Sequence, residues 1–179
     1  MEKSENMPLS THIDDNIALF RKTLHTDESF DLICRPVQIN SRRCCLFFID
    51  GLIKDEVMEK VLEFFYSLDK EEDMREAHTF VKNCVPYVEV AVADNLQQIC
   101  MNILSGVSAL FIDGFEQAIM IDSRTYPQRQ TSEPEKDKSL RGSKDGFVET
   151  LISNTALLRR RIRDTNLRIN AFVVGRESK

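Results

Sequence analysis

The fold is decided at Cys44-Cys45-Leu46-Phe47-Phe48-Ile49-Asp50-Gly51, which holds the longest uninterrupted apolar run of the 179 residues. This run is too short for a membrane span, which needs about twenty residues. A strand that is apolar along its whole length is typical of a sheet covered on both faces. Asp-Gly is a common way for a chain to leave a strand. The stretch therefore predicts a strand that is buried on both sides.

A second stretch of the same kind, Leu110-Phe111-Ile112-Asp113-Gly114, predicts another buried strand over residues 108–112. Together with an apolar run at residues 118–123 it encloses a short turn, which is a hairpin pattern. Common turn chemistry explains the two Asp-Gly stretches better than an internal repeat does. The first stretch gives a strand over residues 43–50, and further strands are predicted at residues 30–39, 87–93 and 168–174.

Helices are predicted where apolar residues recur every three or four positions. Within the polar segment 1–29, such a stripe predicts one amphipathic helix. Residues 69–85 carry only a weak pattern, and residues 124–140, which have no apolar period, predict an extended loop. The predicted helices are one at Ile13, Ile17, Phe20 and Leu24, one beginning near Asp55, one between the N-cap Asp94 and the C-cap Gly106, and one over residues 145–163.

Strands and helices that alternate along the chain, with one hairpin, predict an α/β fold with a mixed β-sheet and flanking helices. The expected organisation is a polar N-terminal segment over residues 1–29 and an α/β lobe over residues 30–179. Apolar residues make up 42% of the chain and charged residues 30%, and neither a signal peptide nor a membrane span is recognisable. These features predict a soluble domain of the cytosol.

No residue pattern indicates catalysis or a metal. The five cysteines form no Cys-x-x-Cys pair, and His12, His25 and His78 are dispersed among polar residues. Neither a nucleotide-binding glycine motif nor a nucleophile elbow occurs. An anion site between Gly142 and Gly146 is less favoured than a turn followed by a helix cap. We therefore expect no enzyme, no cofactor and no metal site.

The net charge of −5 hides an asymmetry, since residues 141–176 carry +5 and residues 1–140 carry −10. This asymmetry predicts internal pairing or a local site for an anionic partner. The arginines of Arg159-Arg160-Arg161-Ile162-Arg163 lie where cations meet the negative end of a helix dipole. No aromatic residues interleave with them, as single-strand binding requires. Acidic carboxylates are the favoured partners, and an anion- or nucleic-acid-binding regulatory domain that uses this cluster is the alternative.

The last predicted helix is expected to pack on the sheet, with part of the cluster Arg159, Arg160 and Arg161 held by carboxylates of the acidic body. Phe147 and Leu151 are expected in the core. A buried Leu151 predicts a cost of about 2–5 kcal/mol for Leu151→Ala. The stripe expected to face the sheet is Val148, Leu151, Ile152, Thr155, Leu158 and Ile162.

At residues 140–149 (LRGSKDGFVE) and 154–162 (NTALLRRRI) the chain resembles the GerA family. This family contains the A-type subunits of bacterial spore germinant receptors and the related stage V sporulation protein AF. Ser143 stands where A subunits usually have Pro and is closer to the AF branch, and Lys144-Asp145 replaces Arg-Glu. The resemblance covers roughly residues 30–179. It also rests on Leu104-Ser105-Gly106, Ala109-Leu110-Phe111-Ile112-Asp113-Gly114, Tyr126-Pro127, Arg129, Glu133-Pro134, Arg163-Asp164, Asn166-Leu167 and Val174-Gly175-Arg176.

The resemblance implies a single lobe of a two-lobe N-terminal domain, on the cytosolic side of a spore inner-membrane protein. The second lobe and the transmembrane region lie outside these 179 residues. It implies an interaction and gating module in spore germination, whose partners are the other lobe and other germination-protein subunits, with self-association as a further option and no nucleic acid. The candidate contact residues, all expected to be exposed, are Arg141, Lys144, Asp145, Asn154, Arg159, Arg160 and Arg161.

Overall fold

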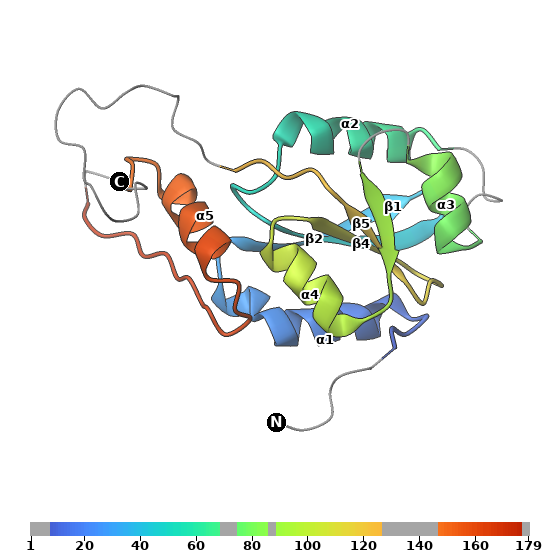
Figure 1. The fold of residues 1–179 in the computed structure, drawn as a ribbon, viewed down its shortest axis with the longest axis horizontal. Helices are drawn as coiled ribbons and strands as arrows, with labels where there is room; N and C mark the ends of the chain where they lie inside the picture. The colour runs from blue at the N-terminus through green and yellow to red at the C-terminus, as the bar shows by residue number, and fades with distance from the viewer. Residues whose placement is uncertain (1–7, 69–74, 86–88, 127–146, 177–179) are drawn as a thin grey trace, which may run out of the picture.

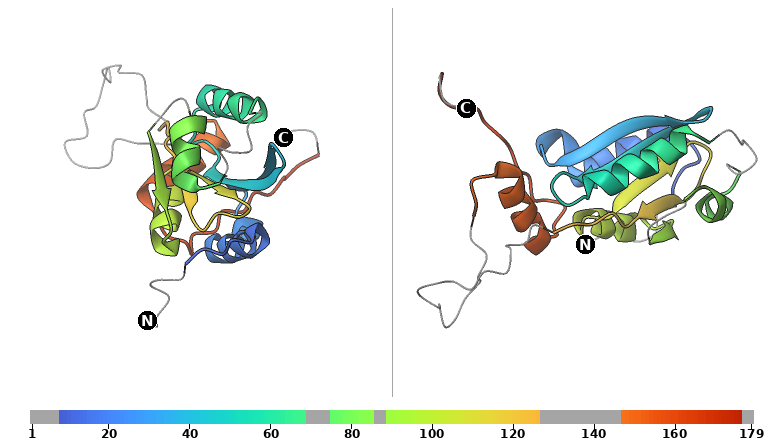
Figure 2. Two further views of the ribbon diagram at one scale, coloured as in Figure 1. Left: turned by 90° about the vertical axis from the view of Figure 1, so that its right-hand side faces the viewer. Right: turned by 90° about the horizontal axis from the view of Figure 1, so that it is seen from above.

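A computed structural model describes residues 8–68, 75–85, 89–126 and 147–176. Within these ranges five strands form one sheet of order β1-β2-β4-β5-β3. Helices α1 and α4 cover one face of the sheet, α2 and α3 cover the other, and α5 lies at one end (Figures 1 and 2). The elements are α1 (Ile13–Leu24), a 3-10 turn (Thr26–Glu28), β1 (Leu32–Ile39), β2 (Arg42–Ile49), α2 (Asp55–Tyr66), α3 (Ala77–Cys84), β3 (Val90–Ala93), α4 (Leu96–Leu104), β4 (Ser108–Ile112), β5 (Ala118–Ile121) and α5 (Leu151–Arg161).

The continuous apolar character of β2 has a direct structural cause. Alternate side chains of a strand point to opposite faces of its sheet. Cys45, Phe47 and Ile49 join the core beneath α1 and α4, whereas Cys44 and Leu46 join the core beneath α2 and α3. The prediction that both faces of this strand are covered is therefore confirmed.

The α/β class with helices flanking one sheet is confirmed. All four strand pairings in the described ranges are antiparallel, where a mixed sheet was expected. Short turns join β1 to β2 and β4 to β5, and a short turn can connect only antiparallel neighbours. The predicted hairpin around residues 113–117 is confirmed by the pairing of β4 with β5.

Helix α1 shares the main core with the sheet. The ring centroid of Phe20 lies 4.7 Å from that of Phe111 and 6.0 Å from that of Phe47. The first N–H of the helix, at Ile13, donates to Oδ1 of Asp113 over 3.0 Å. The side chain that ends β4 therefore also caps the first turn of α1, because the early N–H groups of a helix lack partners within it.

One local prediction on the body of the lobe is wrong, and one segment with only a weak sequence pattern forms a helix. The N-cap of α4 is Asn95, whose side chain accepts from the N–H of Gln98 over 3.0 Å, and not Asp94. Residues 69–85, whose sequence pattern is weak, contain helix α3, in which Ala77, Phe80 and Cys84 are buried. This spacing of three and four is a helical signal, but it extends over only two turns.

Two predictions near the C-terminus are also wrong. Residues 147–150 are not helical, so the described part of the last helix begins at Leu151 and ends at Arg161. Residues 168–174 form no strand, although five of the seven are apolar. A strand exists only where another strand pairs with it, and the described residues offer this segment no such partner.

The aromatic cluster beneath α1 leads to a stability prediction. We expect Phe111→Ala to lower the free energy of unfolding by about 3–5 kcal/mol, because it removes a ring that contacts two others in a close-packed core. Urea denaturation followed by circular dichroism measures this loss. The control is Met101→Ala on the exposed face of α4, which should stay within about 0.5 kcal/mol of the unchanged protein. Equal losses in both variants would contradict this description of the core.

Candidate interface at helix α5

Helix α5 packs against the turn that follows β2. Gly51 has a φ of +81°, and a Cβ atom there would lie 2.6 Å from Cγ2 of Ile152 and 3.2 Å from Cβ of Ala156. The helix approaches the backbone of this turn closely only because the residue is glycine. Both faces of the sheet are already covered by helices α1 to α4, and α5 lies across one end of the sheet (Figure 1).

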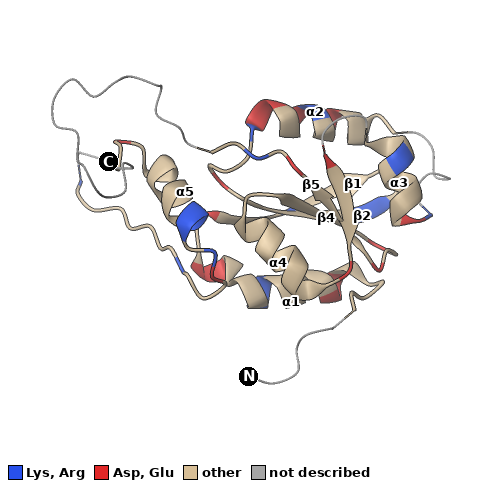
Figure 3. Ribbon diagram, in the orientation of Figure 1, with Lys and Arg blue, Asp and Glu red and all other residues tan. Residues whose placement is uncertain are grey.

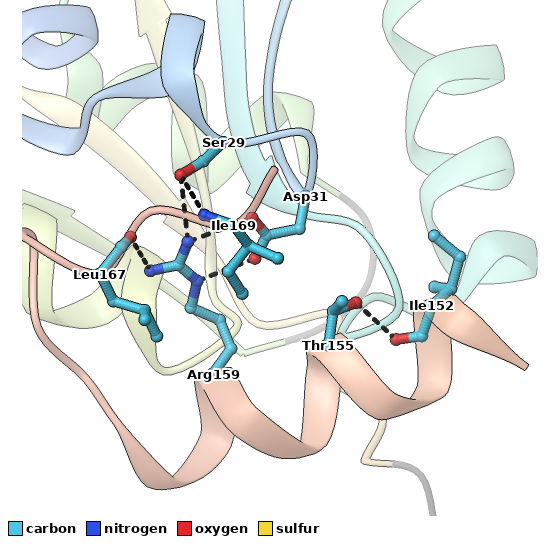
Figure 4. Close-up of polar contacts among 7 residues, drawn as sticks. All are labelled: Ser29, Asp31, Ile152, Thr155, Arg159, Leu167 and Ile169. Atoms are coloured by element: carbon cyan, nitrogen blue, oxygen red, sulfur yellow. Dashed lines mark hydrogen bonds and ion pairs between the residues drawn. The ribbon is translucent and has the colours of Figure 1, made fainter. Parts of the chain in front are cut away.

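Arg159 is the buried anchor of α5. Its side chain and that of Asp31 are both 0% exposed, and its Nε donates to Asp31 Oδ2 over 2.8 Å. Its Nη2 donates to Asp31 Oδ1 over 3.1 Å, and its Nη1 donates to the carbonyl oxygen of Leu167 over 2.8 Å. A planar guanidinium matches a carboxylate in this two-pronged way. Figure 4 shows Arg159 pointing from α5 into the group formed by Ser29, Asp31, Leu167 and Ile169, which we call the Arg159 cluster.

The Arg159 cluster also fastens the segment that follows α5. The N–H of Ile169 donates to Ser29 Oγ over 3.2 Å, and the carbonyl oxygen of Ile169 accepts from the N–H of Phe30 over 3.0 Å. One residue earlier, Arg168 forms an ion pair with Glu28 over 3.1 Å. The chain is thus fixed to the lobe as far as Ile169.

The predicted contact residues fall into three groups. Arg141, Lys144 and Asp145 lie outside the described residues. Arg159 is buried and not exposed as expected, because its charge is matched by Asp31 inside the protein. The expectation that a carboxylate of the acidic body holds part of the arginine cluster is confirmed at this residue.

The remaining candidates lie on the outer side of α5. Asn154 is half-buried, and its amide accepts from the N–H of Val148 over 2.7 Å and donates to the carbonyl oxygen of Val148 over 2.6 Å. Asn154 therefore stabilises the turn before the helix. Arg160 and Arg161 are exposed, and the guanidinium carbon of Arg160 lies 4.5 Å from the ring centroid of Tyr126.

Helix α5 and the segments that flank it carry most of the exposed apolar side chains of the described residues. Leu151 is 56% exposed, so the expectation that it belongs to the core is wrong, as it is for Phe147. Phe172, Val173 and Val174 are between 81% and 85% exposed. Seven of the nine large hydrophobic side chains exposed in the described residues belong to this set, which we call the apolar end. The apolar end consists of Phe147, Val148, Leu151, Ile162, Phe172, Val173 and Val174.

The predicted stripe of α5 divides accordingly. Thr155 is buried, and Ile152 and Leu158 are partly buried, whereas Val148, Leu151 and Ile162 are exposed. The face of α5 that packs on the lobe is centred on the buried residues Ala156 and Arg159. Ala156 contributes to the close contact at Gly51, and Arg159 forms the buried ion pair with Asp31. We therefore replace the expected core-like cost of Leu151→Ala with a value below about 1 kcal/mol.

Charge is distributed unevenly over the described helices. Arg159, Arg160 and Arg161 form the last turn of α5, whereas the first turns of α1 and α2 are acidic (Figure 3). Burial removes Arg159 from any surface that a polyanion could reach. The alternative of an anion- or nucleic-acid-binding domain therefore loses one of the four arginines of its proposed site.

Among the described residues, no group of three or more His, Cys, Asp or Glu side chains is arranged to hold a metal ion. The helices in the same ranges are all too short or too polar to cross a bilayer.

Comparison with protein families places this architecture. The family model described as Bacillus/Clostridium GerA spore germination protein matches residues 18–179. The chain belongs to the GerA family of spore germination proteins. Its fold is similar to the N-terminal domain of the A subunit of the Bacillus megaterium spore germinant receptor GerK3. The TM-score is 0.72 at 20% sequence identity, and the match covers 97% of this chain and 63% of that one.

Two curated GerA relatives come from Bacillus subtilis (strain 168). Stage V sporulation protein AF is 32% identical over 178 residues, which cover 99% of this chain and 36% of that protein. The uncharacterized membrane protein YfkQ is 26% identical over 183 residues, which cover 100% of this chain and 35% of that protein. The chain therefore spans about a third of the length of these relatives. The named relatives are germination, sporulation and membrane proteins and do not support the nucleic-acid alternative.

The sequence did not reveal three residues on which this end depends. Ser29 stands just before the strand predicted over residues 30–39 and Asp31 stands near its start. Neither carries a motif, and their partner Arg159 lies 130 and 128 residues further along the chain. Gly51 was visible as part of an Asp-Gly turn. A glycine in a turn predicts a left-handed backbone, but it does not predict that a helix rests on it.

The buried ion pair leads to a mutational test. We expect Arg159→Met to lower the free energy of unfolding by about 3–5 kcal/mol, because Asp31 is left as an uncompensated buried charge. The control Arg160→Met removes only a cation–π contact at the surface and should cost about 0.5–1 kcal/mol. The double variant Asp31→Val with Arg159→Met should be more stable than Arg159→Met alone. A double variant that loses the sum of both single effects would contradict a coupled pair.

The close approach at Gly51 can be tested with a matched glycine. Gly51 and Gly114 both have left-handed backbones, so an alanine at either position costs about 1–2 kcal/mol of strain. At Gly114 the added Cβ meets only the flexible guanidinium of Arg42, whereas at Gly51 it meets the side chain and backbone of α5. We expect Gly51→Ala to be the more destabilising change and to speed amide hydrogen exchange in α5. Slow exchange in α5 in both variants would show that the helix does not depend on this contact.

Proposed function

We propose that this chain is the first lobe of a cytosolic N-terminal domain in a spore germination membrane protein, and that it acts as an interaction and gating module. The observation that carries the proposal is the apolar end. Exposed apolar patches of this kind mark protein–protein contact sites in soluble domains. Membership of the GerA family gives the contact its biological setting.

The proposed partner of the apolar end is a second lobe. More than a third of the matched GerK3 domain lies outside the part that aligns with this sequence, since the match covers 63% of that chain. A second lobe packed on Phe172 and Val174 would bury side chains that otherwise remain in water. Each fully buried residue of this size contributes about 1.5–3 kcal/mol relative to exposure.

The polar part of the same end suits contacts with other germination subunits. Arg160 and Arg161 project from the last turn of α5 beside the apolar end. Interfaces commonly combine a buried apolar centre with a charged rim. Arg141, Lys144 and Asp145 remain proposed contact residues on sequence grounds. The proposal assigns no catalytic step, cofactor or metal to this chain, because its sequence offers no paired nucleophile and base.

Gating in this proposal depends on rigid attachment. The Arg159 cluster fixes residues 167–169 to the lobe, so a displacement of the lobe is passed directly to whatever follows the segment. A second lobe held on the apolar end would move with α5 as one body. Conformational coupling of this kind requires an element that both sides contact.

The test separates contact from stability. We expect the double variant Phe172→Ser with Val174→Ser to leave the thermal midpoint of the 179-residue chain unchanged, because both side chains are already in water. In spores whose gene carries the variant, nutrient-triggered release of dipicolinate should slow severalfold. The matched control is Tyr66→Ser, which is also exposed, at 57%, and belongs to α2, a helix that covers a face of the sheet and not the end where α5 lies (Figure 1).

Normal germination of spores with the Phe172 and Val174 changes would refute the proposed interface. Slow germination with the control Tyr66→Ser as well would indicate a general effect on protein level, which immunoblotting of spore membranes measures directly.

A further inference from the structure

Two cysteines meet on the edge of the sheet. The sulfur atoms of Cys34 and Cys45 lie 3.4 Å apart. In the register of β1 and β2, Cys34 stands opposite Phe47, and Cys45 stands opposite Pro36. The two cysteines are therefore diagonal neighbours on one face, the face beneath α1. An S–S bond of about 2.05 Å requires the sulfurs to approach by little more than 1 Å.

The two thiols have unequal environments. Cys34 lies on β1, the edge strand, and is partly exposed, whereas Cys45 is 0% exposed. The hydrogen bond from Cys45 holds the pKa of the Cys34 thiol below its ordinary value, and the positive charge of Arg21 acts in the same direction. Burial and the negative charge of Asp27 oppose this lowering. The same hydrogen bond and burial raise the pKa of Cys45.

The other cysteines lack these properties. Burial raises the pKa of Cys44 and of Cys100 to about 12. Cys44 belongs to the core on the opposite face of the sheet, and its thiol donates to the carbonyl oxygen of Arg42 over 3.6 Å. Cys84 is also buried, at 1% exposure. A thiolate, and not a thiol, is the reactive nucleophile, so oxidation should select Cys34.

We propose that Cys34 and Cys45 form a site of reversible oxidation, at which a hydroperoxide converts the two thiols into a disulfide that ties β1 to β2. Cys34 is the attacking cysteine and Cys45 the resolving one. An accessible thiolate beside a second thiol is the arrangement that redox-sensitive proteins use.

The reaction balances in two steps. The Cys34 thiolate attacks one oxygen of hydrogen peroxide, the O–O bond breaks, and the departing hydroxide takes a proton to become water. This leaves a sulfenic acid on Cys34. The Cys45 sulfur then attacks the Cys34 sulfur, the S–O bond breaks, and the departing hydroxide takes the Cys45 proton to form a second water. Both thiols are oxidised and the peroxide is reduced.

The experiment exposes the 179-residue chain to hydrogen peroxide and follows intact mass and tryptic peptides without reduction. Arg42 and Arg43 separate the two cysteines in sequence, so trypsin leaves them on different peptides unless a disulfide joins them. We expect the intact chain to lose two hydrogens, the Cys34 and Cys45 peptides to be joined, and dithiothreitol to reverse the change.

Three variants make the assignment specific. Cys34→Ser should abolish the joined peptide, and Cys45→Ala should stop the reaction at a sulfenic acid on Cys34 that dimedone labels. The matched control Cys44→Ala should keep the joined peptide, because Cys44 faces the other side of the sheet. A link through Cys44, disulfides only between chains, or equal oxidation of all five thiols would overturn the proposal. So would the absence of any disulfide under a large excess of peroxide.

Discussion

The bidentate pair between Arg159 and Asp31 is the interaction on which the end of this lobe depends. Removing two charges from water is costly, and the geometry here offsets that cost with two bonds to the carboxylate and one to the carbonyl oxygen of Leu167. The pair joins three parts of the chain: the residues before β1, helix α5 and the segment that follows it. Without it, α5 would hold to the lobe mainly through the small contact at Gly51, because its outer apolar residues face water.

This end of the lobe exposes apolar side chains, whereas both faces of the sheet are buried under helices. The sheet is sealed on one face by α1 and α4 and on the other by α2 and α3, with a separate core on each side. Helix α5 adds a buried anchor and exposes Leu151 and the residues around it. The proposed role in contacts between domains would need such a surface to be held in place, and the Arg159 cluster fixes the chain to the lobe as far as Ile169.

Regular periodicity made most of the body predictable. The apolar stripes of α1 and α2 indicate which face of each helix is buried. The apolar runs of β2 and β4 do not alternate with polar residues, which indicates that both faces of these strands are buried. The hairpin of β4 and β5 was predictable because turn chemistry is local. The family motif over residues 140–162 named the family correctly, because its order of residue types is long and specific.

The sequence by itself determined the α/β class, the buried strands, three of the helices and the family. Only the tertiary structure decided that Arg159 is buried, that Leu151 is exposed, and that residues 168–174 form no strand in the described chain. The physical reason is the same in each case. Local periodicity indicates which apolar side chains are buried. The burial of a charge or the pairing of a strand requires a partner that the fold brings near. For Arg159 that partner is Asp31, which lies 128 residues away in the sequence.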